Sequence, residues 1–164
     1  MIFVTVGTHE QQFNRLLKEI DRLVEKKIIK EEVFIQTGYS DYEPRHCKWS
    51  KLIPYKEMEA KVKEARIVIT HGGPASFIAP LQIGKTPIVV PRQFELDEHV
   101  NNHQVDFAKQ VSERMGTIIP IYDIKDLEKT IKDYDKIVKE KSKNNTSNNK
   151  AFCNRLEEIV KELI

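Results

Sequence analysis

The chain has 164 residues, which suits one ordinary domain with a real core, and its 40% hydrophobic content argues against a disordered or fibrous protein. Its 27 basic and 25 acidic residues leave a formal net charge of only +2, so we expect no nucleic-acid partner. No apolar run approaches the roughly 20 residues needed to cross a bilayer, and the amino terminus has the pattern of a strand rather than a signal peptide. We therefore expect a cytoplasmic protein.

The two cysteines, Cys47 and Cys153, lie far apart and form no C-x-x-C motif. This spacing predicts neither a metal site nor a redox centre. In a cytoplasmic protein, both side chains are expected to be ordinary reduced thiols.

The first third of the chain alternates strand and helix patterns. Residues 2–6 are almost wholly apolar, which is typical of a central strand covered on both faces, and this strand ends at Gly7. Apolar residues then recur at three- and four-residue steps, which predicts a helix over about 10–26. Three further elements are expected: a second strand at 32–37, a short third strand at 51–53 and a short charged helix at 57–65.

A strand, a turn and a helix follow one another from residue 67. The strand is the apolar run 67–69, and the turn contains Gly72 and Gly73, which permit a ligand to approach the backbone closely. Pro74 suits a first helical position. Ser76 places a hydroxyl in the first turn, where the helix dipole favours an anion. This unit therefore predicts a phosphate cradle.

A second polar loop, 92–99, follows the next predicted strand at 87–90. It leads to a helix that carries four polar residues near its start, Asn101, Asn102, His103 and Gln104. In an open α/β sheet, ligands lie beyond the carboxyl ends of the parallel strands. We therefore expect the two polar loops to face one crevice.

The last part of the chain combines ordered and polar patterns. A short strand is expected at 116–120 and one helix at 124–138, followed by a stretch at 141–150 that has no apolar residue and predicts a linker. Residues 151–164 have the apolar spacing of a last helix, which either packs back on the domain or reaches a partner. We divide the chain into a domain at 1–140, the linker and this C-terminal helix.

The alternation of strands and helices, joined by short connections, predicts a parallel sheet with right-handed crossovers. The expected fold class is thus α/β, a Rossmann-like three-layer domain. No G-x-G-x-x-G motif follows the first strand, which argues against an enzyme that uses a dinucleotide.

Three motifs occur in order over roughly the first two thirds of the chain: MIFVTVGTHE, HGGPASFIAPLQIGKTPIVVPR and EHVNNHQ. They resemble the nucleotide-sugar-binding half of family 28 glycosyltransferases, the C-terminal half of a GT-B enzyme. The nearest branch resembles the soluble catalytic subunits of two-component bacterial exopolysaccharide or capsule glycosyltransferases. These are relatives of the catalytic subunit of the eukaryotic dolichol-linked N-acetylglucosaminyltransferase.

The resemblance implies a donor site built from two kinds of residue. Backbone amides and one hydroxyl would hold the diphosphate, and polar side chains would contact the donor sugar, with Gln104 as the best candidate. The residues implied are Gly7, Thr8, Gly72, Gly73, Ser76, Asn102, His103 and Gln104.

Two basic side chains are further candidates for donor binding. His71 either donates to a phosphate oxygen or orders the glycine turn by bonding to the backbone. Arg92 follows the second strand, where it either pairs with diphosphate oxygens in bidentate fashion or pairs with Glu95 or Asp97.

The candidate catalytic residues are His9 and Glu98. A neutral imidazole near physiological pH can take a proton from an acceptor hydroxyl, which favours His9; the alternative is a residue at a helix start that pairs with Glu10. Glu98 is a candidate base or sugar contact together with Asp97. The alternative for both carboxylates is a helix cap or dipole partner.

One position departs from the family pattern. In many family members a glutamate lies eight residues after the histidine and holds the ribose hydroxyls, but Ala79 stands here. Either Glu95 or Glu98 replaces that contact from the next loop, or the donor sits differently. The loop aromatics either stack on the base or serve packing, and they are Tyr39, Tyr42, Trp49 and Tyr55.

We therefore expect the donor-binding catalytic subunit of an inverting glycosyltransferase. It would move a sugar from a UDP-sugar to a lipid-linked acceptor in exopolysaccharide or capsule synthesis, with no cofactor and no metal. The expected partner is a membrane-anchored subunit that binds the acceptor and recruits the chain to the inner face of the cell membrane. The alternative is a non-catalytic accessory module that stimulates a separate glycosyltransferase subunit.

Overall fold

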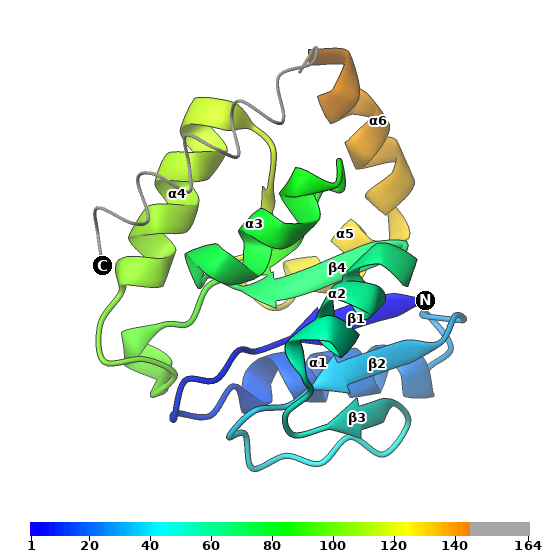
Figure 1. The fold of residues 1–164 in the computed structure, drawn as a ribbon, viewed down its shortest axis with the longest axis vertical. Helices are drawn as coiled ribbons and strands as arrows, with labels where there is room; N and C mark the ends of the chain where they lie inside the picture. The colour runs from blue at the N-terminus through cyan, green and yellow to red at the C-terminus, as the bar shows by residue number, and fades with distance from the viewer. Residues whose placement is uncertain (145–164) are drawn as a thin grey trace.

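The computed structural model describes residues 1–144, and in this range six strands form one parallel sheet in the order β3-β2-β1-β4-β5-β6 (Figure 1). The strands are β1 Ile2–Thr5, β2 Val33–Gln36, β3 Lys48–Ser50, β4 Ile67–His71, β5 Ile88–Val90 and β6 Ile119–Pro120. The chain builds outward from β1 in one direction and from β4 in the other. The boundary between β1 and β4 is therefore the topological switch point, where a doubly wound sheet leaves room for a ligand.

Helices cover both faces of this sheet. They are α1 Asn14–Glu25, α2 Tyr55–Glu64, α3 Pro74–Gln82, α4 His103–Met115, α5 Asp126–Lys132 and α6 Tyr134–Asn144, with a short 3-10 turn, η1, at Phe94–Leu96. Hydrophobic contacts place α1, α5 and α6 on one face and α2, α3 and α4 on the other. This arrangement confirms the predicted Rossmann-like three-layer fold.

Side-chain alternation along the strands fills both layers. In β1, Ile2 and Val4 join the cluster under α1, whereas Phe3 joins the cluster under α2. The same alternation separates Ile67 from Val68 in β4. Each such fully buried aliphatic or aromatic side chain contributes about 1.5–3 kcal/mol of transfer free energy, so the central strands anchor the domain.

The helix after β1 begins later than the sequence pattern indicated. It starts at Asn14, whose backbone amide donates to Gln12 Oε1 and whose side-chain oxygen accepts the amides of Asp41 and Tyr42. Residues 10–13 are therefore a loop rather than a helical turn. This loop is free to contact the segment after β5, which bears directly on the site.

Two elements differ from the expectations in kind or position. The third strand is Lys48–Ser50 rather than 51–53, because Lys48 is in register with Phe34 while Ile53 packs under α2. The single helix expected at 124–138 is two helices that meet at Asp133. The change of direction buries the ring of Tyr134, and its hydroxyl donates to the carbonyl oxygen of Thr86 over 2.6 Å.

The carboxy-terminal boundaries also shift. Helix α6 continues to Asn144, so the first four residues of the predicted linker are helical. The rest of that linker, and the helix predicted at 151–164, lie outside the described residues. Within residues 1–144, no helix is both long enough and apolar enough to cross a membrane.

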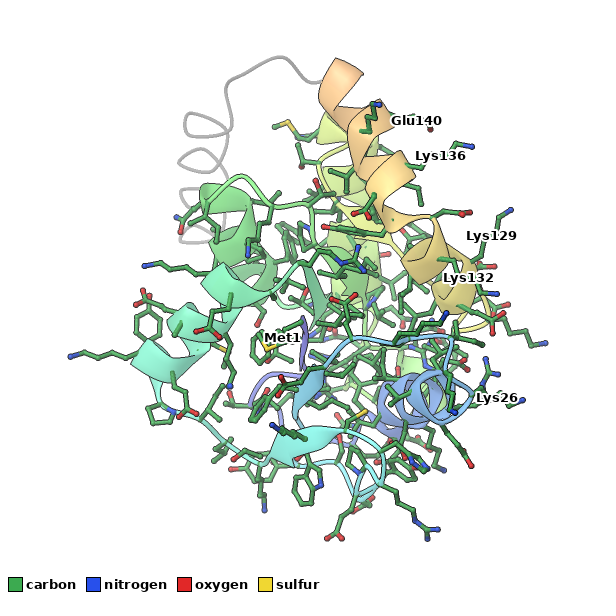
Figure 2. The ribbon with its side chains drawn as sticks, turned by 90° about the vertical axis from the view of Figure 1, so that its right-hand side faces the viewer. Met1, Lys26, Lys129, Lys132, Lys136 and Glu140 are labelled. Atoms are coloured by element: carbon green, nitrogen blue, oxygen red, sulfur yellow. The ribbon has the colours of Figure 1, made fainter. Side chains whose placement is uncertain are left out.

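The outer faces of the helices carry solvated charges. Figure 2 shows Lys129, Lys132, Lys136 and Glu140 on α5 and α6, and Lys26 at the end of α1.

Burial raises the pKa of the Cys47 thiol to about 12, as expected for an unreactive structural cysteine.

Candidate functional site

The loops that follow β1, β4 and β5 meet at the carboxyl edge of the sheet. Gln104, at the start of α4, accepts through Oε1 the backbone amides of Gly72 and Arg92, both over 3.0 Å. The two polar loops therefore converge as predicted. In Figure 1, the blue loop after β1 and the yellow-green segment before α4 also lie at the same edge.

The imidazole of His71 lies between two glycines. A Cβ at Gly7 would lie 2.4 Å from His71 Nε2, and a Cβ at Gly73 would lie 2.2 Å from His71 Cε1, so no side chain fits at either position. Gly7 also has a φ of 76°, a conformation that favours glycine. These glycines leave the space that the ring fills.

His71 orders the turn through hydrogen bonds. Its Nδ1 accepts the amide of Gly73 over 3.1 Å, and Nε2 lies 2.8 Å from Ser76 Oγ. Burial, reinforced by the nearby charge of Arg92, lowers the pKa of His71 to about 3, so the ring is neutral at physiological pH. Because Nδ1 accepts, Nε2 carries the proton and donates to Ser76.

Ser76 is left with a donor for a ligand. Its oxygen accepts a hydrogen bond from His71 Nε2–H. The hydroxyl hydrogen of Ser76 is therefore available to an anion at the first turn of α3. The amides of Gly72 and Gly73, by contrast, donate to Gln104 and His71 inside the protein. The two amides expected to hold the diphosphate thus already have acceptors within the protein.

Gln36, at the end of β2, fixes the loop after β1. Its side-chain amide accepts the Gly7 amide and donates to the Gly7 carbonyl oxygen, each over 3.1 Å, and its oxygen also accepts the Thr5 hydroxyl over 2.7 Å. The Gly7 amide is therefore also occupied, whereas Thr8 is exposed to solvent. The sequence motifs did not point to Gln36, although a polar residue at the end of an apolar strand can indicate a side chain at the carboxyl edge of the sheet.

Arg92 holds backbone rather than facing the crevice. Its side chain is fully buried, and its guanidinium donates to four carbonyl oxygens, those of Val6, Gln11, Gln12 and Glu98. Burial lowers the pKa of Arg92 to about 10, which leaves the group charged at neutral pH. The expected bidentate contact with a diphosphate is therefore not available, and Arg92 joins the loops after β1 and β5.

Glu98 is likewise a structural residue. It is 1% exposed, and its carboxylate accepts two hydrogen bonds from Arg15 of α1, at 2.9 and 3.0 Å, and one from the amide of Gln93. A buried carboxylate held by an arginine is not free to take a proton from a substrate. Glu98, expected as a catalytic base or a ribose contact, therefore has its carboxylate engaged within the protein.

The residues at the start of α4 divide into internal and exposed groups. Asn102 accepts the amide of Phe94 over 3.0 Å and donates to Glu95 over 2.8 Å, which fixes η1. Gln104 is 8% exposed and is occupied by Gly72 and Arg92. Of the three residues expected to contact the donor sugar, His103 has the side chain that is open to solvent.

His9 lies beside His99, which the sequence motifs did not single out as a site residue. Its ring stacks on His99 with centroids 4.4 Å apart and planes 11° apart, and its Nε2 lies 2.9 Å from Gln11 Oε1. Burial, together with the nearby His9 and Arg92, lowers the pKa of His99. The stack joins the loop after β1 to the segment before α4, a pairing that no short sequence pattern reveals.

Neither of two surface cavities adjoins these residues. One, of about 500 Å³, lies at the opposite edge of the sheet beside Ile2, Glu31 and Arg66. The other, of about 370 Å³, lies beside Tyr42 and Trp49. Across the described part of the chain, no group of three histidine, cysteine or acidic side chains is arranged to hold a metal ion.

A parallel sheet with a helix amino terminus at its switch point defines a Rossmann-like ligand-binding domain, of the kind that forms the C-terminal half of GT-B glycosyltransferases. Residues 1–163 match the glycosyltransferase family 28 C-terminal domain, and the chain belongs to this family. Comparison with curated proteins gives no match.

Solved structures confirm the fold. A crystal structure of the glycotransferase of kitacinnamycin is similar with a TM-score of 0.58 and 19% identity, over 99% of this chain and 38% of that one. The glycosyltransferase SnogD from Streptomyces nogalater is similar with a TM-score of 0.50 and 16% identity, over 96% of this chain and 43% of that one. The chain thus spans less than half the length of these two structures.

Proposed function

We propose that this domain binds the UDP-sugar donor of an inverting glycosyltransferase that serves exopolysaccharide or capsule synthesis, and that it carries the catalytic groups. The observation that carries the proposal is the neutral His71 that donates to Ser76 at the amino terminus of α3, beside the switch point. This arrangement leaves a hydroxyl donor and a helix dipole directed at an anion, which suits a diphosphate leaving group.

A second subunit binds the acceptor in this proposal. Three large apolar side chains, Phe94, Leu96 and Val100, are 55%, 43% and 62% exposed on the segment that borders the site. Exposed apolar side chains gathered beside a site favour a protein contact there. We propose a membrane-anchored partner that holds a lipid-linked sugar over this edge and recruits the chain to the inner face of the membrane.

The accessory-module alternative is favoured by one observation. Glu98 and Arg92, both expected to act on the substrate, are buried in internal contacts. His9 is then the candidate base that this chain itself supplies. In an assay of the chain with its partner subunit, a His9→Ala variant that keeps full transfer activity would favour the accessory role.

The donor assignment is tested with UDP and Ser76→Ala. Loss of one hydrogen bond to a charged oxygen costs about 1.5 kcal/mol, so we expect roughly tenfold weaker UDP binding by calorimetry. Ser76→Thr keeps the hydroxyl and is expected to retain most of the affinity. Ser112→Ala, on α4, is the control for an unrelated serine.

Two results would contradict the donor assignment. A wild-type chain that binds no UDP would refute it outright. Equal UDP affinity in the wild type and in a folded Ser76→Ala variant would remove Ser76 from the site.

A further inference from the structure

The ring of His9 is held from two sides by residues that are far apart in the sequence. His99 stacks on one face of the ring, and Gln11 Oε1 lies within hydrogen-bonding distance of Nε2, at 2.9 Å. A histidine on an exposed loop is ordinarily free to rotate. Here both the plane and one nitrogen of the ring are fixed.

The orientation of the Gln11 amide follows from its other contact. Its Nε2 donates to the carbonyl oxygen of Asp97 over 3.4 Å, so its Oε1 must be the atom that faces His9. Since an amide oxygen only accepts, His9 Nε2 carries the hydrogen. The neutral ring therefore keeps its lone pair on Nδ1, which accepts no hydrogen bond from the side chains described in residues 1–141 or from the backbone of residues 1–144.

The loop that carries these residues is anchored independently of His9. Gln12 donates to the carbonyl oxygens of Leu96 and Asp97 over 3.2 and 3.1 Å, and Arg92 donates to the carbonyl oxygens of Gln11 and Gln12. The contact between Gln11 and His9 is thus not needed to join the loop to the segment before α4. It has an orienting effect of its own.

We propose that Gln11 is a positioning residue that sets the tautomer of His9, with His99 as the stacking support, so that Nδ1 is the proton acceptor of the transfer reaction. This inference rests on the proposed function. The acceptor hydroxyl oxygen forms a bond to the anomeric carbon while the bond from that carbon to the diphosphate oxygen breaks, and its electron pair leaves with the diphosphate. The hydroxyl proton moves to His9 Nδ1, and Gln11 Oε1 accepts from the Nε2–H of the imidazolium.

The charged groups around His9 make the Gln11 oxygen important as a hydrogen-bond acceptor. The groups whose charges interact with His9 are His99, from the segment before α4, which also stacks on its ring, and His71 of β4. Each of them is cationic when protonated and opposes a charge on His9. The carboxylate of Glu98, in the segment before α4, is paired with Arg15. A neutral oxygen at Gln11 is then the contact that stabilises the imidazolium.

The experiment uses the full chain and three variants, Gln11→Met, Gln11→Glu and Gln12→Met. Hydrolysis of UDP-glucose, UDP-galactose and UDP-N-acetylglucosamine is followed as UDP release against pH, with water in place of the acceptor hydroxyl, and UDP affinity is measured by calorimetry. We expect Gln11→Met to lower kcat at least tenfold while the Kd for UDP changes less than twofold. Gln11→Glu restores an acceptor oxygen, so it should recover kcat and move the acidic limb of the pH profile upward by about one unit.

The Gln12→Met control removes two hydrogen bonds to the segment before α4 and the one from the Asn14 amide without touching His9. Its kcat and pH profile are expected to match the wild type. The inference is overturned if Gln11→Met keeps the wild-type kcat, if Gln12→Met loses as much activity as Gln11→Met, or if the acidic limb does not move in Gln11→Glu. It is also overturned if the wild type binds UDP but hydrolyses none of the three donors. UDP binding with no effect at Gln11 refutes this inference alone, whereas absence of UDP binding refutes the proposed function and this inference with it.

Discussion

At the scale of single residues, His71 acts as a neutral connector at the centre of the site. It accepts from Gly73, donates to Ser76 and fills the space beside Gly7. A cationic ring would repel the buried guanidinium of Arg92, which is one cause of the lowered pKa. The hydrogen-bond chain from the turn to the Ser76 hydroxyl therefore depends on an uncharged imidazole.

This state predicts a specific acid sensitivity. The pKa of His71 is about 3 in the folded chain and about 6.5 when the chain is unfolded, so between these values the unfolded state binds the additional proton. Stability is complete above pH 6.5 and falls as the pH drops towards 3, with a contribution from this residue of up to about 1.4 kcal/mol per pH unit. Urea unfolding at several pH values measures it.

His71→Gln is expected to lower stability at neutral pH but to flatten its dependence on pH in this window. The matched control is His46→Gln, which replaces an exposed histidine and should leave the slope unchanged. An identical slope in His71→Gln and the wild type would show that His71 does not cause the acid sensitivity.

At the scale of elements, side chains from one loop hold the backbone of another. Gln104 joins the turn after β4 to the strand end at Arg92, and Arg92 joins that strand end to the loop after β1. Buried backbone groups need partners, and these loops have no neighbouring strand to supply them. The amide and guanidinium side chains take over that role.

Replacement of Gln104 tests this structural role. In Gln104→Leu, the amides of Gly72 and Arg92 lose their acceptor while they remain buried, which costs about 1–3 kcal/mol for each amide. We expect the free energy of unfolding to fall by about 2–6 kcal/mol, together with weaker UDP binding, measured by urea denaturation and calorimetry. A direct sugar contact alone would instead leave the folding stability intact.

Gln110→Leu is the control, because Gln110 lies on the same helix and is exposed. Its stability is expected to stay within about 0.5 kcal/mol of the wild type. If Gln104→Leu were as stable as this control, the proposed link between the two loops would be wrong.

At the scale of the whole molecule, the sheet separates a ligand edge from a structural edge. The carboxyl ends of β1, β4 and β5 carry the glycines, histidines and Ser76, whereas the opposite edge carries the ion pairs of Arg66 with Glu31 and Asp135. Parallel strands place all their carboxyl ends together, so the chain arrives at the same edge at the end of every strand.

Hydrogen exchange with and without UDP tests this division. We expect saturating UDP to slow exchange in peptides that cover 7–13 and 71–79 and to leave peptides over 26–31 and 62–67 unchanged, because bound ligand restricts opening of the loops it contacts. The intact chain is labelled and then digested, and mass spectrometry of the peptides gives the comparison. Protection confined to the opposite edge would place the nucleotide elsewhere.

Local sequence patterns were enough to predict the architecture and the convergence of the polar loops at one edge of the sheet. Strand and helix periods are local properties, and apolar runs such as 2–6 and 67–69 can be buried in few ways other than in a parallel sheet. The rule that ligands lie beyond the carboxyl ends of strands predicted that the two polar loops converge, and Gln104 indeed accepts the amide of Gly72.

Local sequence patterns did not show which polar side chains have partners inside the protein and which are exposed at the site edge. Arg15 and Glu98 are 83 residues apart and pair in the interior. The two terminal nitrogens of the Arg92 guanidinium donate to backbone carbonyl oxygens. A charged side chain at a strand end has the same sequence signature whether it binds substrate or protein, because both uses require the same donors and acceptors. The difference depends on distances across the fold, which no local pattern contains.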